Sequence, residues 1–188
     1  MGLPARRRMT VEEFLAWTPP DDGLRYELVE GFPVGQAWPS TPHGRITANL
    51  GIAIGTRLRS GDRPCAPEQG STLRIDARDT VRAPDLLVRC GKSELEANDP
   101  VLAIEVVSPS NTARELSRRR RDYALAGIRE VLEVEQDTAE VRAYRLRGEF
   151  WVEEGTVRDL GGEVRLESLD LTIPMAEIYR AIPLDEQA

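Results

Sequence analysis

The 188-residue sequence predicts an α/β fold in which a mixed β-sheet core is flanked by helices, with additional antiparallel strands. Two patterns support this class. Every fourth residue from Ile46 to Leu58 is aliphatic, as on the buried face of a helix. Short β-branched runs such as VLAIEVVS at 101–108 have the length and composition of strands. Because neither a repeat nor a low-complexity linker interrupts them, we expect a single domain over residues 1–188, with its core at about 9–180.

The first half of the chain contains two helix start signals. Thr10 precedes Glu13 by three residues, the spacing of a capping box, and Pro19-Pro20 end this short helix. A longer helix is expected from the turn at Ser40-Thr41-Pro42 to about Gly61. Strands are expected between and after these helices, at about 25–30, 32–38, 63–68, 71–75 and 84–89.

The second half alternates strand and helix before it becomes a meander. The charged segment GKSELEAND at 91–99 leads into VLAIEVVS, and Ser108-Pro109 break that strand. Asn111 or Thr112 then caps a helix that reaches about Ala126, before Gly127. The meander comprises REVLEVEQ, AEVRAYRLR, EFWVEEG, TVRDLGG and EVRLESL, and the last segment, LTIPMAEIYRAI, is expected to form a short helix.

The composition excludes some classes of protein. A net charge of -7 argues against a broadly basic nucleic-acid coat, although a local basic groove beside an acidic metal site is compatible with it. No apolar run reaches the ~18–20 residues that span a bilayer. The N-terminal MGLPARRRMTVEEF lacks the apolar stretch of a secretory signal, so a cytoplasmic location is expected. Cys65 and Cys90 lie 25 residues apart without a CxxC motif, and we expect two reduced thiols.

Two carboxylates occur at the ends of apolar strands. Asp85 enters a strand in APDLLV, and Glu105 lies near the exit of VLAIEVVS. An antiparallel pairing of these strands would bring the two acids together. Two close carboxylates repel unless a cation lies between them, and Mg²⁺ is commonly bound by one or two carboxylates together with water. Ordinary strand-edge charges give the same pattern, so this second interpretation stays open.

Two further groups are candidates for the same site. Glu27 and Glu30 in RYELVEG are out of phase, so they point to opposite faces of a strand and one of them can face the site. His43 is the only histidine and lies at the start of the long helix, where the helix dipole disfavours the imidazolium. It either positions water or phosphate or is a capping or surface residue.

The run RELSRRRRDYALAG places four consecutive arginines, 118–121, in a helix. If Leu116 and Tyr123 mark the buried side, Arg119 and Arg120 flank it at ~100° per residue. These inner guanidiniums need anionic partners, and Glu105, Asp85 or a bound phosphate would serve. Arg118 and Arg121 point away, toward either a nucleic-acid backbone or solvent.

Taken together, RYELVEG, TPHGRI, APDLLV, VLAIEVVSPSNT and YALAGIREV resemble the small restriction endonucleases of the Uma family, within the PD-(D/E)XK nuclease superfamily. The resemblance extends from Met9 to Tyr179. It implies a restriction-endonuclease-like core and hydrolysis of DNA phosphodiester bonds with Mg²⁺ or Mn²⁺. It further implies that Asp85 and Glu105 bind the metal with Glu27 as an auxiliary acid, and that His43 belongs to the catalytic group.

The sequence departs from the family at one site position. The resemblance places the family's lysine four residues before Tyr123, where this chain has Arg119, with Glu115 at the position of the preceding acid. The family's aromatic-Trp pair is also replaced, by Val131-Leu132-Glu133. Arginine can stabilise a phosphate, but its pKa above ~12 prevents it from acting as a general base.

Three hypotheses therefore stand. The first is a metal-dependent DNA endonuclease, and the second is a nuclease-fold protein with impaired catalysis that binds DNA or protein as an accessory. In the third, Asp85 and Glu105 form only a buried ion network with Arg119 and Arg120. The sequence does not decide whether the substrate is DNA or RNA. It is compatible with a homodimer and does not establish one.

Overall fold

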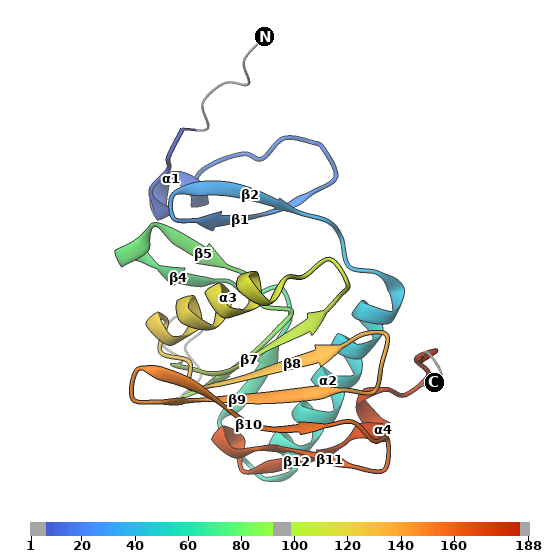
Figure 1. Ribbon diagram of the computed structural model, residues 1–188. Coiled ribbons are helices and arrows are strands. Elements are labelled where there is room, and N and C mark those ends of the chain that lie inside the picture. The colour runs from blue at the N-terminus through green and yellow to red at the C-terminus, as the bar shows by residue number, and fades with distance from the viewer. Residues whose placement is uncertain (1–6, 92–98, 185–188) are drawn as a thin grey trace. The chain divides into compact units, whose positions relative to one another are not determined.

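The computed structural model describes residues 7–91 and 99–184, which form two compact units (Figure 1). The smaller unit comprises residues 7–39 and 72–83, and the larger unit comprises residues 40–71, 84–91 and 99–184. Most of the charged segment expected to join two strands, residues 92–98, lies outside the described residues, as does the start of the N-terminal basic segment. The two units are described separately below.

The smaller unit is a four-stranded sheet with one short helix. Helix α1 (Val11–Leu15) begins with the expected capping box, in which Thr10 and Glu13 each bond to the other's backbone N–H. The strand order is β2-β1-β5-β4. The strands are β1 (Arg25–Val29), β2 (Phe32–Gln36), β4 (Leu73–Ile75) and β5 (Thr80–Arg82), and a 3-10 turn at Asp76–Arg78 joins the last two. Val11, Leu28 and Val81 form its buried centre.

The larger unit is built on a mixed six-stranded sheet in the order β10-β9-β8-β7-β6-β3. The strands are β3 (Cys65–Glu68), β6 (Leu86–Cys90), β7 (Asp99–Val107), β8 (Glu130–Glu135), β9 (Val141–Arg147) and β10 (Phe150–Val157). Neighbouring strands are antiparallel except β7 and β8. A parallel pair needs a crossover, and helix α3 (Ala113–Leu125) provides it.

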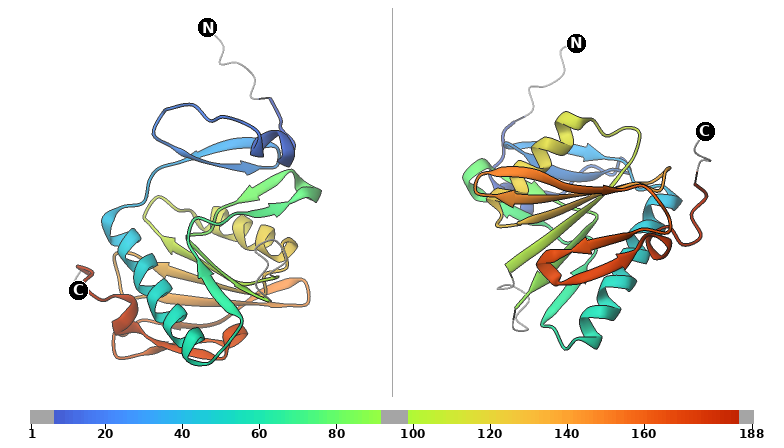
Figure 2. Two further views of the ribbon diagram at one scale, coloured as in Figure 1. Left: turned by 180° about the vertical axis from the view of Figure 1, so that it is seen from behind. Right: turned by 60° about the horizontal axis from the view of Figure 1, so that its bottom comes forward.

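The two faces of this sheet have different coverings. Helix α2 (Thr41–Ser60) lies on one face, as the view from behind shows (Figure 2), and its aliphatic residues pack with Ile104 and Val106 of β7. A two-stranded sheet of β11 (Glu163–Leu166) and β12 (Leu171–Pro174), with the one-turn helix α4 (Met175–Ile178), extends this core. Helix α3 lies on the other face (Figure 1). Because strand residues alternate between faces, Glu105 points toward α3.

The predicted α/β class with a mixed sheet is confirmed, and several local predictions can be scored. The long helix begins and ends where its cap and Gly61 predicted, and Thr112 is the cap of α3. Strand β5 was missed because its three residues, all buried, are too short to show alternation. The last segment contains strand β12 as well as the expected short helix.

The expectation of two reduced thiols is wrong, because Cys65 and Cys90 form a disulfide. They lie directly opposite each other in the antiparallel pair β3–β6, with Cα atoms 4.0 Å apart. Strand pairing thus brings together two residues whose spacing in the sequence carries no disulfide signal. Disulfides are rare in cytosolic proteins, so this bond does not favour the expected cytoplasmic location. Separately, none of the helices in the described residues is long and apolar enough to cross a membrane.

Candidate active site

Asp85 lies where the chain enters β6, directly after Pro84. Its Oδ2 atom accepts a hydrogen bond from the backbone N–H of Val106 at 2.8 Å. The same oxygen lies 3.1 Å from His43 Nε2, and only 11% of the Asp85 side chain is exposed. The carboxylate is therefore held between strand β7 and the first turn of helix α2.

His43 is positioned by the start of α2. Ser40 caps this helix by accepting the His43 backbone N–H at 3.3 Å. With Nε2 beside the Asp85 carboxylate, Nδ1 is buried and has no hydrogen-bond partner among the described residues. If Nε2 carries the proton toward Asp85, Nδ1 is an acceptor and can receive a hydrogen bond from a water or a substrate hydroxyl.

Glu105 is buried under helix α3, with 8% of its surface exposed. Tyr123 of α3 donates its hydroxyl to Glu105 Oε1, and Arg119 Nη1 lies 3.4 Å from the same oxygen. Both partners are themselves buried. Two donors from one helix therefore compensate a carboxylate in the middle of an apolar strand, as buried charges require.

Arg119 joins two acids, because its Nη2 atom lies 3.5 Å from Glu115 Oε1, one turn earlier in α3. The arginine at the position of the family's lysine thus points inward and contacts Glu105, as its place on the helix predicted. Arg120 also points toward the sheet, but its partner is Glu133 of β8 and not Asp85. The predicted network of two acids with two arginines is therefore only partly present.

Asp85 and Glu105 lie at the same end of the β6–β7 pair. The strands are antiparallel, with Leu86 opposite Ile104 and Leu87 opposite Ala103. Asp85 and Glu105 are each one residue beyond the pair Leu86–Ile104, and Asp85 bonds to the residue that follows Glu105. The two strands thus have the antiparallel pairing under which we expected the two acids to lie together.

Glu27 belongs to the smaller unit, where it is buried in β1. Its Oε2 lies 2.9 Å from Arg82 Nη1, and its Oε1 accepts the Ala83 backbone N–H at 2.9 Å. Ala83 stands two residues before Asp85 in the sequence. Within its own unit, Glu27 therefore holds the segment from which the chain continues to Asp85.

Glu133 is a buried acid that the sequence reasoning missed. It lies beside Glu105 in the parallel β7–β8 register, and burial raises the pKa of its carboxyl while Arg120 and Arg142 oppose the shift. Its signal in the sequence is a carboxylate inside the apolar run VLEV, the same kind of signal that singled out Glu105. A cavity of about 270 Å³ opens beside it, at the carboxyl ends of β7 and β8.

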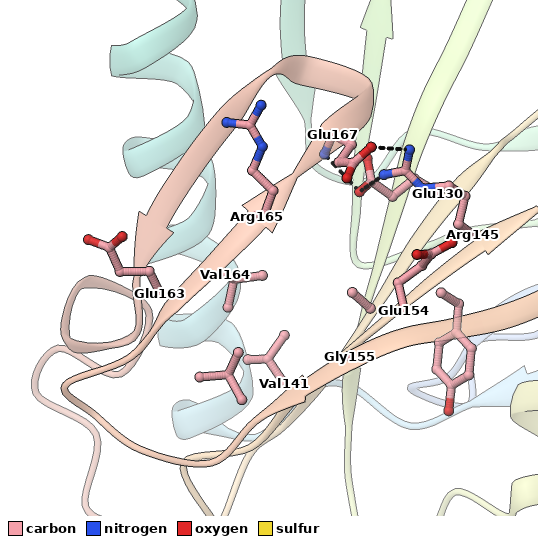
Figure 3. Close-up of a pocket in the computed structure, with 12 residues that line it drawn as sticks. Glu130, Val141, Arg145, Glu154, Gly155, Glu163, Val164, Arg165 and Glu167 are labelled. Carbon is pink, nitrogen blue, oxygen red and sulfur yellow. Dashed lines mark hydrogen bonds and ion pairs between the residues drawn. The ribbon is translucent and has the colours of Figure 1, made fainter.

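A second cavity, of about 230 Å³, is lined by residues of β8, β9, β10 and β11, and none of the predicted site residues lines it (Figure 3). Its wall includes Val141 and Val164, and its polar end contains three residues that pair with one another. Arg145 lies 3.3 Å from Glu130 and 2.6 Å from Glu167. Glu130 also accepts hydrogen bonds from the backbone N–H groups of Glu167 and Ser168. These polar contacts therefore stabilise the turn that joins β11 to β12.

The donor set of Asp85 and Glu105 fits a hard divalent cation bound mainly by water. Mg²⁺ commonly takes one or two protein carboxylates and completes its shell with waters and substrate oxygens. No described residue bonds to Asp85 Oδ1, which leaves that oxygen available. Within residues 7–91 and 99–184, no group of three or more His, Cys, Asp or Glu side chains could hold a metal ion. The remaining ligands would therefore be water and substrate.

Comparison with solved structures finds the same fold in another protein. The chain is similar to a crystal structure described as a putative nuclease belonging to DUF820, from Anabaena variabilis, with a TM-score of 0.73. The sequences are 17% identical, and the similarity covers 91% of this chain and 97% of that one. A search of curated proteins finds no match.

The sequence model of the Uma2 family, described as "Putative restriction endonuclease", matches residues 11–176. The protein therefore belongs to the Uma2 family, and the resemblance inferred from its motifs is confirmed. Membership of this family supports a nuclease role.

Proposed function

We propose that the protein is a Mg²⁺- or Mn²⁺-dependent endonuclease that hydrolyses DNA phosphodiester bonds. The observation that carries this proposal is the bond from Val106 N–H to Asp85, because it fixes Asp85 at the end of β7 that also carries Glu105. Family membership and the nuclease-like fold support the reaction class.

In this proposal Asp85 and Glu105 bind the cation. When bound, such an ion lowers the pKa of a water and neutralises charge that develops on the phosphate. Tyr123 and Arg119 orient Glu105, and the positive charge of Arg119 favours phosphate nearby. Arg119 keeps its proton, so we assign no proton transfer to it. His43 holds Asp85 through Nε2 and can accept a hydrogen bond from water at Nδ1.

Glu27 is the auxiliary acid of the proposal. Both of its oxygens are already bonded within the smaller unit, to Arg82 and to the Ala83 backbone. We therefore expect Glu27 to hold the segment that leads to Asp85, in addition to any contact that it makes with the metal.

Plasmid nicking tests the proposal. Supercoiled DNA is incubated with Mg²⁺ or Mn²⁺ and with wild type, Asp85→Asn or Glu105→Gln, which remove charge while keeping side-chain shape. We expect each substitution to lower the cleavage rate by more than ~100-fold, since each removes one of the few protein ligands. Asp159→Asn is the matched control, because Asp159 is exposed and, within the described part of the chain, its side chain accepts a hydrogen bond from the nearby Gly161 N–H alone. Equal cleavage by all four proteins would refute the assignment.

A second function is favoured by one contact, the Glu105–Arg119 ion pair. A guanidinium already neutralises the carboxylate that the metal would need. The alternative is a protein with impaired catalysis that binds DNA or protein as an accessory. Arg119→Lys separates the two: a large gain of cleavage would identify an intact site limited by arginine, whereas unchanged cleavage in an active wild type would show that arginine suffices. Absence of Mn²⁺ binding by calorimetry in both proteins would favour the accessory role.

DNA as the partner, a cytoplasmic location and a homodimer belong to the same proposal. Strand β10 lies at an edge of the six-stranded sheet and exposes 75% of Phe150, which is compatible with contact between two copies. Light scattering coupled to size exclusion measures the mass in solution and decides the last point.

A further inference from the structure

Helix α3 carries arginines on the face opposite the supports of Glu105. Arg114, Arg118 and Arg121 are separated by four and three residues, so at about 100° per residue they fall within an arc of roughly 60°. This arc lies opposite buried Leu116. At ~1.5 Å per residue the row is about 10 Å long. Arg114 and Arg121 are exposed and Arg118 is partly exposed. These three residues are called the outer arginine stripe.

The stripe differs from three other exposed arginines of the larger unit, each of which has a carboxylate partner. Arg147 lies 2.8 Å from Glu154, Arg158 lies 2.8 Å from Glu140, and Arg165 pairs with Asp170. Across the part of the chain that the structure describes, no carboxylate lies within ion-pair distance of the outer arginine stripe. Like charges at i and i+4 destabilise a helix. The stripe therefore carries a repulsion that an external anion would relieve.

The form of the stripe fits a polyanion with regular spacing. Arginine binds phosphate through two parallel N–H groups, and its weak hydration favours such contacts. One strand of B-DNA carries a phosphate for every ~3.4 Å of helix axis, so a row of about 10 Å spans roughly three phosphate steps. Charge complementarity thus favours a nucleic-acid backbone, even though the whole chain has a net charge of -7.

We propose that the outer arginine stripe of α3 binds the phosphate backbone of duplex DNA, away from the phosphate that reacts. The choice of DNA rests on the proposed function. Glu105 lies beneath the opposite face of the same helix, held by Tyr123 and Arg119. The stripe therefore contributes to affinity and not to the chemical step, and its loss raises KM while kcat is unchanged.

The salt dependence of binding tests this proposal directly. Anisotropy of a fluorescent DNA duplex is measured in EDTA between about 50 and 200 mM KCl. Each neutralised phosphate contributes about 0.9 to the slope of log affinity against log salt, so the triple variant Arg114→Gln/Arg118→Gln/Arg121→Gln should lose about 2.7 of that slope. Over this range the wild type then loses about 40-fold more affinity than the triple variant.

Two further triple variants control for net charge and for folding. Arg147→Gln/Arg158→Gln/Arg165→Gln removes the same charge from arginines that are already paired, and its slope should stay near that of wild type. A triple lysine variant at the stripe keeps the point charges and should retain the slope. Thermal melts of all variants verify that each is folded.

Each outcome separates this proposal from the proposed function. Equal slopes for the two glutamine triples, or no duplex binding by wild type, overturns the role of the stripe, whatever the cleavage assay shows. Stripe-dependent binding that is tighter to RNA than to DNA overturns the choice of DNA. Stripe-dependent DNA binding combined with full cleavage by Asp85→Asn supports the stripe and refutes the metal site, because EDTA removes the metal from the binding assay.

Discussion

The buried contact from Tyr123 to Glu105 predicts a measurable effect on stability. Tyr123→Phe deletes only the hydroxyl, so the ring continues to fill its place in the core and leaves no large cavity. A hydrogen bond to a charged group contributes about 1.5–3 kcal/mol, and the carboxylate left behind is buried. We expect the free energy of unfolding to fall by about that amount. For a chain of this length the melting temperature should drop by roughly 3–12 °C.

Chemical denaturation of three variants and wild type isolates the contact. In a Glu105→Gln background the acceptor is neutral, so Tyr123→Phe should cost only about 0.5–1.5 kcal/mol. The coupling between the two positions should therefore be near 1 kcal/mol. Tyr144→Phe is the matched control, because its hydroxyl bonds to the exposed Glu153 at 3.3 Å and its loss should cost less than about 0.5 kcal/mol. Equal costs at Tyr123 and Tyr144, or no coupling to Glu105, would refute the reasoning.

Two more predictions concern the larger unit. Without reductant, Cys65 and Cys90 should resist alkylation, and ready alkylation of the unreduced protein would contradict the disulfide. Reduction should expose two thiols and lower the free energy of unfolding by about 3–4 kcal/mol, as expected for a loop of this length. Arg57 bonds to Glu177 and lowers the pKa of its carboxyl, so this ion pair stabilises the fold above the ordinary carboxyl pKa and is lost as pH falls through the lowered value. Glu177→Gln should cost less than ~1 kcal/mol at pH 7, because the pair is partly exposed, and denaturation curves should show this difference vanishing in acid.

The sequence was most informative where a local signal agreed with the tertiary fold. Ser40 and Pro42 started α2 and Gly61 ended it, and the four-residue aliphatic repeat gave its buried face. The signal was weakest where only distant partners define an element. Strand β5 has three residues and exists because β1 and β4 flank it, and the Cys65–Cys90 bond follows from a strand pairing that spacing alone does not encode.

The candidate site was predictable in its acids and less so in their partners. Asp85 and Glu105 stood out because carboxylates interrupt apolar strands, and helical periodicity turned Arg119 inward. The same periodicity could not choose the partner of Arg120, because Glu133 becomes its neighbour only through the parallel register of β7 and β8. In the sequence Tyr123 served only to locate Arg119, four residues before it. Its hydrogen bond to Glu105 could not be predicted, because it depends on how α3 packs across the sheet.

The ion pairs of this protein have a consequence for its behaviour in alkali. All but one of its 25 cationic side chains are arginines, which keep their charge at any pH at which proteins remain folded. The described salt bridges of arginine therefore do not weaken through loss of a proton from the cation as pH rises. Tyrosines respond to alkali instead: burial raises the pKa of Tyr179, whose hydroxyl bonds to the backbone oxygens of Glu135 and Glu140, so its contribution to stability is lost as pH rises above the ordinary phenol pKa. Acid therefore acts on these ion pairs through their carboxylates, whereas alkali acts on the buried phenol of Tyr179.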